Sequence, residues 1–266
     1  MRFLLDSPHQ TNCTRGLYFV FLSAMVFSLA VPIAQADTLK ILTLGDSITQ
    51  AESNRASYRY SLWKKLVDSG IDFDLVGSMN KQFDKYNPGP APQPAYRGLN
   101  FDLDHEGHFA WRIGEIINGR SHDNGSGKGK LADWLESYEV DIALIHLGTN
   151  DAFQRLPHNV TTTNLNTIIK LLRESNPEVV IMLAQLIPAA QSPGDDEAVK
   201  ALNKIIPQIA AAMNTDKSPV IVVDHFTGFD LSSDTYDNVH PTASGEEKMG
   251  QAWFDAINDY LKATRQ

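Results

Sequence analysis

The sequence has almost no cysteine. Its single cysteine, Cys13, lies in an N-terminal segment that we expect to be removed from the mature chain. One thiol cannot form an internal disulfide, and a mature chain without cysteine has neither a thiol nucleophile nor a cysteine-based metal site. Thiol–disulfide chemistry and structural zinc of the cysteine type are therefore excluded.

Basic residues are also scarce. The 23 Lys and Arg residues are outnumbered by 32 Asp and Glu residues, which gives a formal net charge of −9. Phosphate backbones and anionic lipid surfaces repel such a chain, so we expect no nucleic-acid partner and no stable membrane association. Hydrophobic residues make up 42% of the chain, enough for a packed core, and uncharged substrates suit it best.

Only one hydrophobic run is long, and it lies at the N-terminus. Gly16–Ala34 is apolar, follows Arg2 and Arg15, and ends at the small-residue cleavage pattern of residues 34–36. This pattern predicts a signal peptide over residues 1–36 and a single mature domain over residues 37–266. An uncleaved membrane anchor is the alternative. We therefore expect a secreted or periplasmic protein.

Short apolar runs alternate with amphipathic stretches through the rest of the chain. The runs are rich in Val, Ile and Leu, as expected of strands that are buried on both faces of a parallel sheet. The alternation predicts one α/β domain. The predicted strands are Leu39–Leu44, Asp74–Gly77, Ile142–Leu147, Val179–Leu186 and Val220–Val223; the predicted helices are Tyr58–Ser69, Val160–Ser175, Asp196–Met213 and Glu247–Lys262.

Three polar segments stand where chemistry would be placed in such a domain. Gly45-Asp46-Ser47 ends the first predicted strand, and Gly148–Asp151 follows the third. Ligand sites in open α/β sheets lie at the carboxyl ends of strands. Ser47 is therefore a candidate nucleophile, and the Asn150 amide is a candidate donor to an oxyanion. Taken alone, Gly45-Asp46-Ser47 is better explained as an ordinary turn, and Gly148–Asp151 is equally compatible with one.

The third segment, Asp237–His240, precedes the last predicted helix. A serine hydroxyl becomes a good nucleophile when a base accepts its proton, and a carboxylate orients that base. Asp237 and His240 are three residues apart in a turn and can meet the requirement together. His225 is a rival base, but its neighbour Asp224 is adjacent in sequence and its side chain diverges. His146 lies inside an apolar run and is typical of a core histidine.

These segments, in this order and spacing, resemble the GDSL-type, or SGNH, hydrolase family, and the resemblance extends from Ile41 to about Gly250. It implies a three-layer α/β/α domain of flavodoxin-like type, with a mostly parallel five-stranded sheet. It also implies Ser47 as nucleophile, His240 as base and then acid, and Asp237 as its partner. The Ser47 N–H and the Asn150 amide would hold the oxyanion.

The family's second block matches His105–Arg112 imperfectly. Related carbohydrate esterases have a glycine before the tryptophan as a main-chain oxyanion donor, whereas this chain has Ala110 before Trp111. Alanine can serve if its φ is not positive, so we assign the role to Ala110, with Gly107 as the fallback. Arg112 is a candidate for binding a substrate carboxylate or for a structural ion pair.

The same block is similar to acetylxylan-esterase-like members. It implies a secreted carboxylic ester hydrolase that removes acetyl groups from a carbohydrate through an acyl-enzyme. We assign substrate contacts to Asp46, Trp111, Phe109 and Tyr96, although Trp111 and Phe109 are equally compatible with core packing. The alternatives are a lipid-active esterase, lysophospholipase or thioesterase, and a catalytically silent carbohydrate-binding protein.

No cofactor or metal is expected. His105, Glu106 and His108 give H-E-x-H, one residue short of the zinc motif H-E-x-x-H, and Gly125–Lys130 lacks the spacing of a phosphate loop. The expected partner is a small-molecule or polysaccharide ester, and the expected oligomeric state is a monomer.

Overall fold

The core of the fold is a parallel β-sheet. The computed structural model describes residues 38–264 except 53–54, 56 and 85–92, so the predicted signal peptide lies outside the described residues. The five longer strands are β1 (Leu39–Gly45), β2 (Phe73–Val76), β4 (Ile142–His146), β5 (Val180–Gln185) and β6 (Val220–Asp224). They lie in the order β2-β1-β4-β5-β6, and every pair is parallel. These strands match the five predicted from the apolar runs.

A sixth strand, β3 (Glu106–Gly107), was not predicted. It pairs in parallel with the end of β1, where Leu44 lies opposite Glu106 and Gly45 opposite Gly107. Two residues are too few to produce an apolar pattern, so no sequence feature indicated this strand. The short strand matters because it brings the second sequence block directly beside Gly45.

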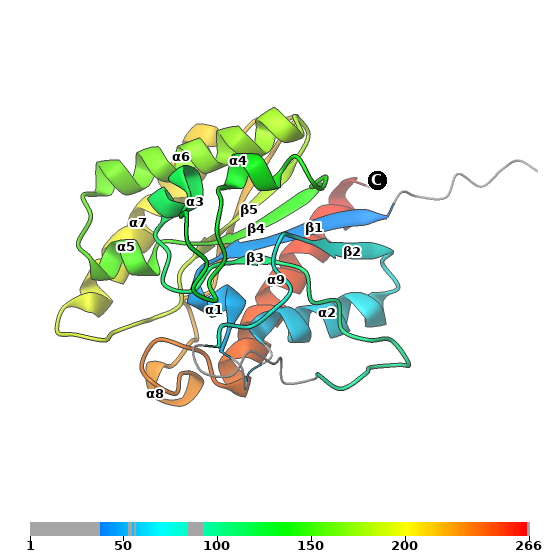
Figure 1. The fold of residues 1–266 in the computed structure, drawn as a ribbon, viewed down its shortest axis with the longest axis horizontal. Coiled ribbons are helices and arrows are strands. Elements are labelled where there is room, and N and C mark those ends of the chain that lie inside the picture. Colours follow the sequence, from blue (N-terminus) through cyan, green and yellow to red (C-terminus); the bar gives the residue numbers. More distant parts are fainter. Residues whose placement is uncertain (1–37, 53–54, 56, 85–92, 265–266) are drawn as a thin grey trace, which may run out of the picture. The chain divides into compact units, whose positions relative to one another are not determined.

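Helices cover both faces of the sheet and make the predicted three-layer α/β/α arrangement (Figure 1). One layer contains α3 (Ile113–Asn118), α4 (Leu131–Trp134), α5 (Thr149–Phe153), α6 (His158–Ser175) and α7 (Asp195–Met213). The other contains α1 (Ser47–Gln50), α2 (Ser57–Ser69) and α9 (Ala243–Thr264), with the short α8 (Leu231–Asp234) before α9. No described helix is both long and apolar enough to span a bilayer.

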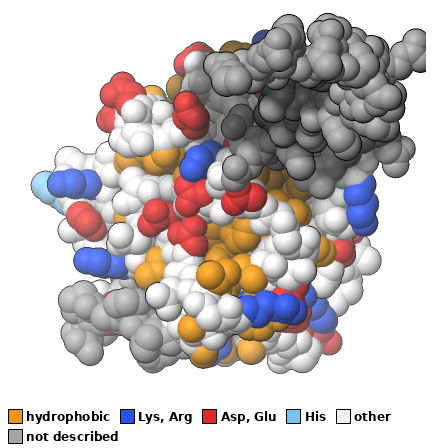
Figure 2. Space-filling view, turned by 90° about the vertical axis from the view of Figure 1, so that its right-hand side faces the viewer, with side chains coloured by type: hydrophobic (Ala, Val, Ile, Leu, Met, Phe, Trp, Pro, Cys, Tyr) orange, Lys and Arg blue, Asp and Glu red, His pale blue; other side chains and the backbone are white. Residues whose placement is uncertain are grey.

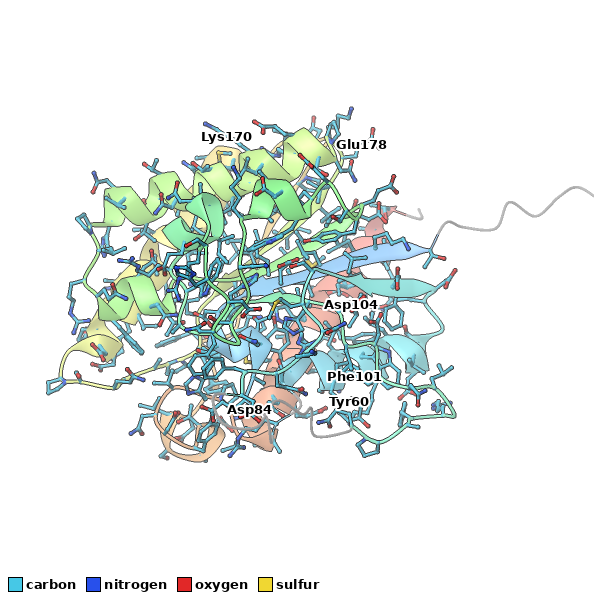
Figure 3. The ribbon with its side chains drawn as sticks, viewed as in Figure 1. Tyr60, Asp84, Phe101, Asp104, Lys170 and Glu178 are labelled. Carbon is cyan, nitrogen blue, oxygen red and sulfur yellow. The ribbon has the colours of Figure 1, made fainter. Side chains whose placement is uncertain are left out.

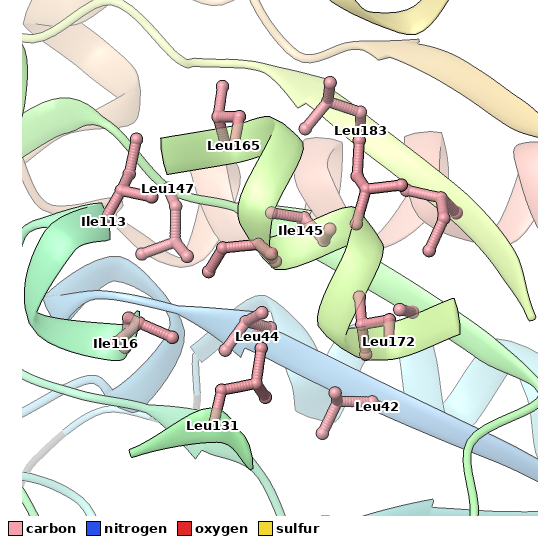
Figure 4. Close-up of a cluster of buried hydrophobic side chains, with 14 of the residues drawn as sticks. Leu42, Leu44, Ile113, Ile116, Leu131, Ile145, Leu147, Leu165, Leu172 and Leu183 are labelled. Atoms are coloured by element: carbon pink, nitrogen blue, oxygen red, sulfur yellow. The ribbon is translucent and has the colours of Figure 1, made fainter. Parts of the chain in front are cut away.

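Each face of the sheet has its own hydrophobic core, because successive residues of a strand point to opposite faces. Leu42, Leu44 and Ile145 pack under α6 (Figure 4). Ile41 and Leu144 point the other way, toward the cluster that includes residues of α2 and α9. On that side an aromatic group borders α2, where Tyr60 meets Phe101 edge-on at 5.2 Å (Figure 3).

The two ends of the strands differ in character. The side at the right of Figure 1 is the end where β1 begins, and Figure 2 shows acidic side chains bordering an apolar area there. The carboxyl ends of the strands meet on the opposite side, where the segments after β1 and β4 carry the polar residues singled out in the sequence. The site therefore lies at the carboxyl ends, as expected for this fold.

Candidate active site

The segment after β1 is shaped by local packing. Gly45 ends the strand, and a Cβ added there would lie 1.9 Å from the Thr49 hydroxyl oxygen, so only glycine fits. Asp46 then caps α1, because its carboxylate accepts a hydrogen bond from the Ile48 N–H at 3.0 Å. Ser47 consequently becomes the first residue of α1, at the strand's carboxyl end.

The turn before α9 brings Asp237 and His240 together. One carboxylate oxygen of Asp237 accepts from the main-chain N–H of Val239 at 3.1 Å and of His240 at 2.7 Å. The other lies 2.7 Å from His240 Nδ1. Asn238 adopts a positive φ of 65°, a conformation that asparagine tolerates better than most residues. Local hydrogen bonds therefore fix the carboxylate and the imidazole in one orientation.

The other imidazole nitrogen reaches the serine. His240 Nε2 lies 3.0 Å from Ser47 Oγ, which joins residues 193 positions apart. Because the Asp237 carboxylate accepts at Nδ1, that nitrogen carries the proton, and Nε2 is free to accept the Ser47 proton. Burial opposes ionisation of Asp237, but hydrogen bonds from the His240 main chain and ring outweigh it and lower its pKa. The arrangement can thus remove a proton from Ser47.

Asp46 does not fit its predicted substrate contact. Its side chain is fully buried and serves as the cap of α1, so a substrate cannot touch it. Burial raises the pKa of this carboxyl to about 6, although the Ile48 N–H opposes the shift. Asp46 therefore shapes the serine turn from behind.

Ala110 lies on an exposed turn beside this centre but departs from the sequence expectation. Its φ is +62°, the left-handed region that alanine adopts only at a cost of about 1 kcal/mol. The expectation that Ala110 has a φ that is not positive was therefore wrong. A positive φ leaves the main-chain donor in place, and the N–H groups of Ser47 and Ala110 donate to none of the described residues.

Gly107, the fallback donor, is excluded by its own hydrogen bond. Its N–H donates to His105 Nδ1 at 2.9 Å, and the residue is buried against the main chain of Gln50. Asn150 lies within reach of the same turn, because its amide donates to the Trp111 carbonyl at 3.0 Å. A longer contact of 3.4 Å runs to Asp46, so this second amide hydrogen is weakly held.

Two of the aromatic residues assigned to the substrate were placed wrongly. Trp111 is fully buried, donates its indole N–H to Ser126 Oγ at 3.2 Å and packs on His108, so the packing alternative is correct. Tyr96 donates its hydroxyl to Asp68 near the far end of α2. That position is about 16 Å along the helix from Ser57, whose hydroxyl contacts the Thr49 carbonyl near Ser47.

Phe109 lies beside the histidine, together with residues that the sequence analysis missed. The Phe109 ring is stacked on His240 at 5.7 Å and on Phe83 at 3.9 Å between centroids. Tyr236 is stacked on His240 at 5.8 Å. Gln50 accepts from the Phe109 N–H at 2.7 Å and so holds this turn. Tyr236 was discoverable because it directly precedes Asp237, whereas Phe83 gave no local sign.

The H-E-x-H residues form a structural network. Glu106 and His108 are fully buried, and His108 Nε2 lies 2.8 Å from the Glu106 carboxylate. His108 Nδ1 meets the Ser126 carbonyl at 2.8 Å, and His105 Nε2 meets the Lys81 carbonyl at 3.2 Å. Within the described ranges, no group of three or more His, Cys, Asp or Glu side chains is arranged to hold a metal ion. Arg112 is likewise engaged, with Glu115 of α3 and with Gln154.

His225 and His146, the other two histidines considered, form a separate buried pair. Their ring centroids are 5.8 Å apart, and His225 also packs on Trp253 at 4.5 Å. Neither ring contacts Ser47 in the part of the chain that the structure describes. Burial lowers the pKa of His146 to about 4 and, with the neighbouring ring, holds the pKa of His225 well below its ordinary value.

A serine, a histidine and an aspartate hydrogen-bonded in series, at the strand ends of a parallel α/β sheet, form the arrangement that serine hydrolases use. The comparison with protein families agrees with this class. The chain belongs to the GDSL-like lipase/acylhydrolase family, whose model matches residues 43–248.

Among related proteins and solved structures, several esterases are similar to this chain. A "Multidomain esterase" of Ruminococcus flavefaciens is 30% identical over 241 residues, which cover 86% of this chain and 30% of that protein. The chain thus spans less than a third of that relative. A carbohydrate esterase family 3 structure from Talaromyces cellulolyticus is 27% identical with a TM-score of 0.68, covering 85% of this chain and 99% of that one. An acetyl esterase mutant with an acetate ion is 26% identical, with the same TM-score and coverage.

Proposed function

We propose that this protein is an ester hydrolase that removes short acyl groups, acetyl above all, from a carbohydrate through an acyl-enzyme. The observation that carries the proposal is the hydrogen-bonded series of Asp237, His240 and Ser47. The acetyl and carbohydrate parts rest on the similarity to a carbohydrate esterase and to an acetyl esterase with an acetate ion.

The proposed reaction has two halves that use the same residues. Ser47 Oγ bonds to the ester carbonyl carbon and gives its proton to His240 Nε2. The bond to the alcohol oxygen then breaks, the alcohol takes the proton from His240, and the acyl group stays on Ser47. A water molecule repeats the sequence with His240 as its base, which releases the carboxylic acid and restores Ser47.

The oxyanion that forms in each half would be held by main-chain and side-chain donors. The N–H groups of Ser47 and Ala110 are the proposed main-chain donors, because neither is used by a described residue. The Asn150 amide would supply the third by exchanging its long contact with Asp46 for the oxyanion. Donors held in place in this way stabilise charge that develops only in the transition state.

Export is part of the proposal. It rests on Arg2 and Arg15, the apolar run Gly16–Ala34 and the small residues that follow it. A polysaccharide substrate fits an exported enzyme, because such polymers lie outside the cell. N-terminal sequencing of the protein recovered from the producing cell's medium or periplasm tests this part; a chain that still begins before residue 30 would contradict it.

Acyl-chain profiling tests the ester class. Wild-type protein is assayed with 4-nitrophenyl esters from two to ten carbons, and acetate release is measured on acetylated polysaccharides. We expect the rate to fall as the chain lengthens beyond acetyl. A rate that rises toward the ten-carbon ester would instead favour a lipid-active esterase. Retained activity in Ser47→Ala would overturn the serine mechanism itself.

A further inference from the structure

Tyr236 is an exposed aromatic residue directly beside the catalytic base. It keeps 37% of its surface exposed, and within the described ranges only Leu99 and Val160 are comparably exposed large apolar side chains. Its ring is nearly parallel to the His240 imidazole, with an angle of 21° and a centroid distance of 5.8 Å. Phe109 borders the same imidazole, and the described structure contains no ring contact between Phe109 and Tyr236.

The proposed mechanism determines which half of the ester lies beside Tyr236 and Phe109. His240 protonates the departing alcohol from Nε2, and an imidazole transfers a proton at the edge of its own ring. The alcohol oxygen must therefore lie against that edge. Any part of the alcohol larger than its oxygen then extends past the rings that border His240, which are Tyr236 and Phe109.

Two charged side chains lie on Tyr236 and extend this surface. The Tyr236 hydroxyl donates to Glu52 Oε2 at 3.0 Å, and the Arg55 guanidinium carbon lies 3.7 Å from the ring centroid. Glu52 and Arg55 are both half-buried, and neither forms an ion pair with a described residue. Glu246 lies near Arg55, but burial raises its pKa to about 7 and leaves it only partly charged at neutral pH.

A second group that also combines a tyrosine, an acid and an arginine shows the arrangement in which the arginine is already paired. Tyr96 donates its hydroxyl to Asp68 at 2.8 Å, and Arg97 lies over the Tyr96 ring at 5.7 Å. Arg97 also forms an ion pair with Asp68 at 2.6 Å, so its charge is already matched. Among the described residues, by contrast, the Arg55 guanidinium donates no hydrogen bond and one Glu52 carboxylate oxygen accepts none.

We infer that Glu52, Arg55 and Tyr236 form the subsite for the alcohol half of the ester, and that this alcohol is a neutral sugar. Neighbouring sugar hydroxyls can accept from Arg55 and donate to Glu52, while the sugar's C–H groups contact the edges of Tyr236 and Phe109. Glu52 and Arg55 have opposite formal charges, so the pair has no net charge that would select a charged sugar over a neutral one. The inference rests on the proposed function and adds the residues that choose its alcohol.

The test compares two acetyl esters that differ only in the alcohol. Acetylated xylo-oligosaccharides reach the subsite, whereas ethyl acetate releases an alcohol too short to touch Glu52 or Arg55. Arg55→Gln and Glu52→Gln are each expected to lower kcat/KM on the sugar ester about tenfold, mainly through KM. Rates on ethyl acetate should stay within about twofold, because the three catalytic side chains are untouched.

Arg97→Gln is the matched control, since it removes an arginine that lies on a tyrosine away from the base, and it should change neither substrate. Tyr236→Phe keeps the ring but releases Glu52, so its loss on the sugar ester should be smaller than that of Glu52→Gln. Circular dichroism spectra that match the wild type establish that each variant is folded.

Three outcomes would overturn the inference. Equal losses on both esters would mean that these residues only position His240, and unchanged sugar-ester kinetics would mean that they do not touch the sugar. In either case the proposed function would stand. A wild-type enzyme that cleaves ethyl acetate but no sugar acetate would overturn both the subsite and the carbohydrate part of the proposed function.

Discussion

His240 and His225 both lie at the carboxyl-terminal end of the sheet, but their side chains have different hydrogen-bond partners. His240 has a carboxylate at one ring nitrogen and a serine hydroxyl at the other. His225 has no hydrogen-bond partner at either nitrogen within the described structure and lies among Trp253 and His146. Both residues are buried. Burial and position at a strand end therefore do not distinguish the two histidines, whereas the carboxylate paired with His240 does.

The largest expected effect comes from removing the His240 imidazole. His240→Ala should lower kcat by on the order of 10⁶-fold, because the proton acceptor for Ser47 is lost. Ser47→Ala should be equally severe, and the double variant should be no worse, since the two residues act as a unit. Initial rates on 4-nitrophenyl acetate measure this. A double variant far slower than either single one would contradict a shared role.

Asp237→Asn tests the carboxylate by itself. The amide no longer stabilises the charged imidazole or fixes its tautomer, but the base remains, so we expect a loss of about 10⁴-fold in kcat, smaller than that of His240→Ala. The same assay with the Asp234→Asn control separates this effect from a general change in the acidic turn. If Asp237→Asn kept full activity, the hydrogen bond seen at 2.7 Å would have no catalytic part.

The buried pair of His225 and His146 should affect how the free energy of unfolding depends on pH. His146, its neighbour, has a folded-state pKa of about 4, well below that of an exposed histidine near 6.5. As the pH falls, His146 therefore takes up its proton in the unfolded chain before it does so in the folded protein. Its contribution to the free energy of unfolding is fully present above pH 6.5 and is lost as the pH falls toward 4. The loss from this one group is on the order of 3 kcal/mol.

Urea unfolding at pH 7 and at pH 4.5 measures this dependence. His146→Leu should make the difference in unfolding free energy between the two pH values smaller, because no proton is then taken up at that position. His158→Leu, at an exposed histidine, is the control and should leave the difference unchanged. An unaltered pH dependence in His146→Leu would show that the acid response arises elsewhere.

The smallest expected effect is that of His225→Ala on activity. His225 makes no contact with the serine, so kcat at pH 7.5 should stay within about threefold of wild type once the variant is shown to be folded. The removed ring leaves a cavity, and the unfolding free energy should fall by about 2 kcal/mol or more. A collapse of activity here, with His240→Ala remaining active, would exchange the roles of the two histidines.

Much of this arrangement was accessible from sequence because it depends on local pattern. The parallel strands are continuous apolar runs, and Asp237 and His240, only three positions apart, meet within one turn. Strand β3 was missed because its two residues, Glu106 and Gly107, are too few to show a pattern. Apolar runs of several residues are therefore readable from sequence, and a two-residue strand is not.

The errors among the aromatic residues have one physical cause. Whether an aromatic residue faces solvent depends on what the rest of the chain places against it. Trp111 is covered by His108 and Trp134, and its indole N–H is taken by Ser126. Tyr236 is fixed by Glu52, 184 positions earlier in the chain. Such distant pairings leave no trace in a local motif.

The contact between Ser47 and His240 also ties activity to the order in which the chain folds. These residues lie 193 positions apart, on either side of the segment that supplies four of the five longer strands. The helices next to them, α2 and α9, pack together on one face. Closing so long a loop is slow. Regain of esterase rate during refolding would therefore report the final closure of the whole chain, after secondary structure has returned.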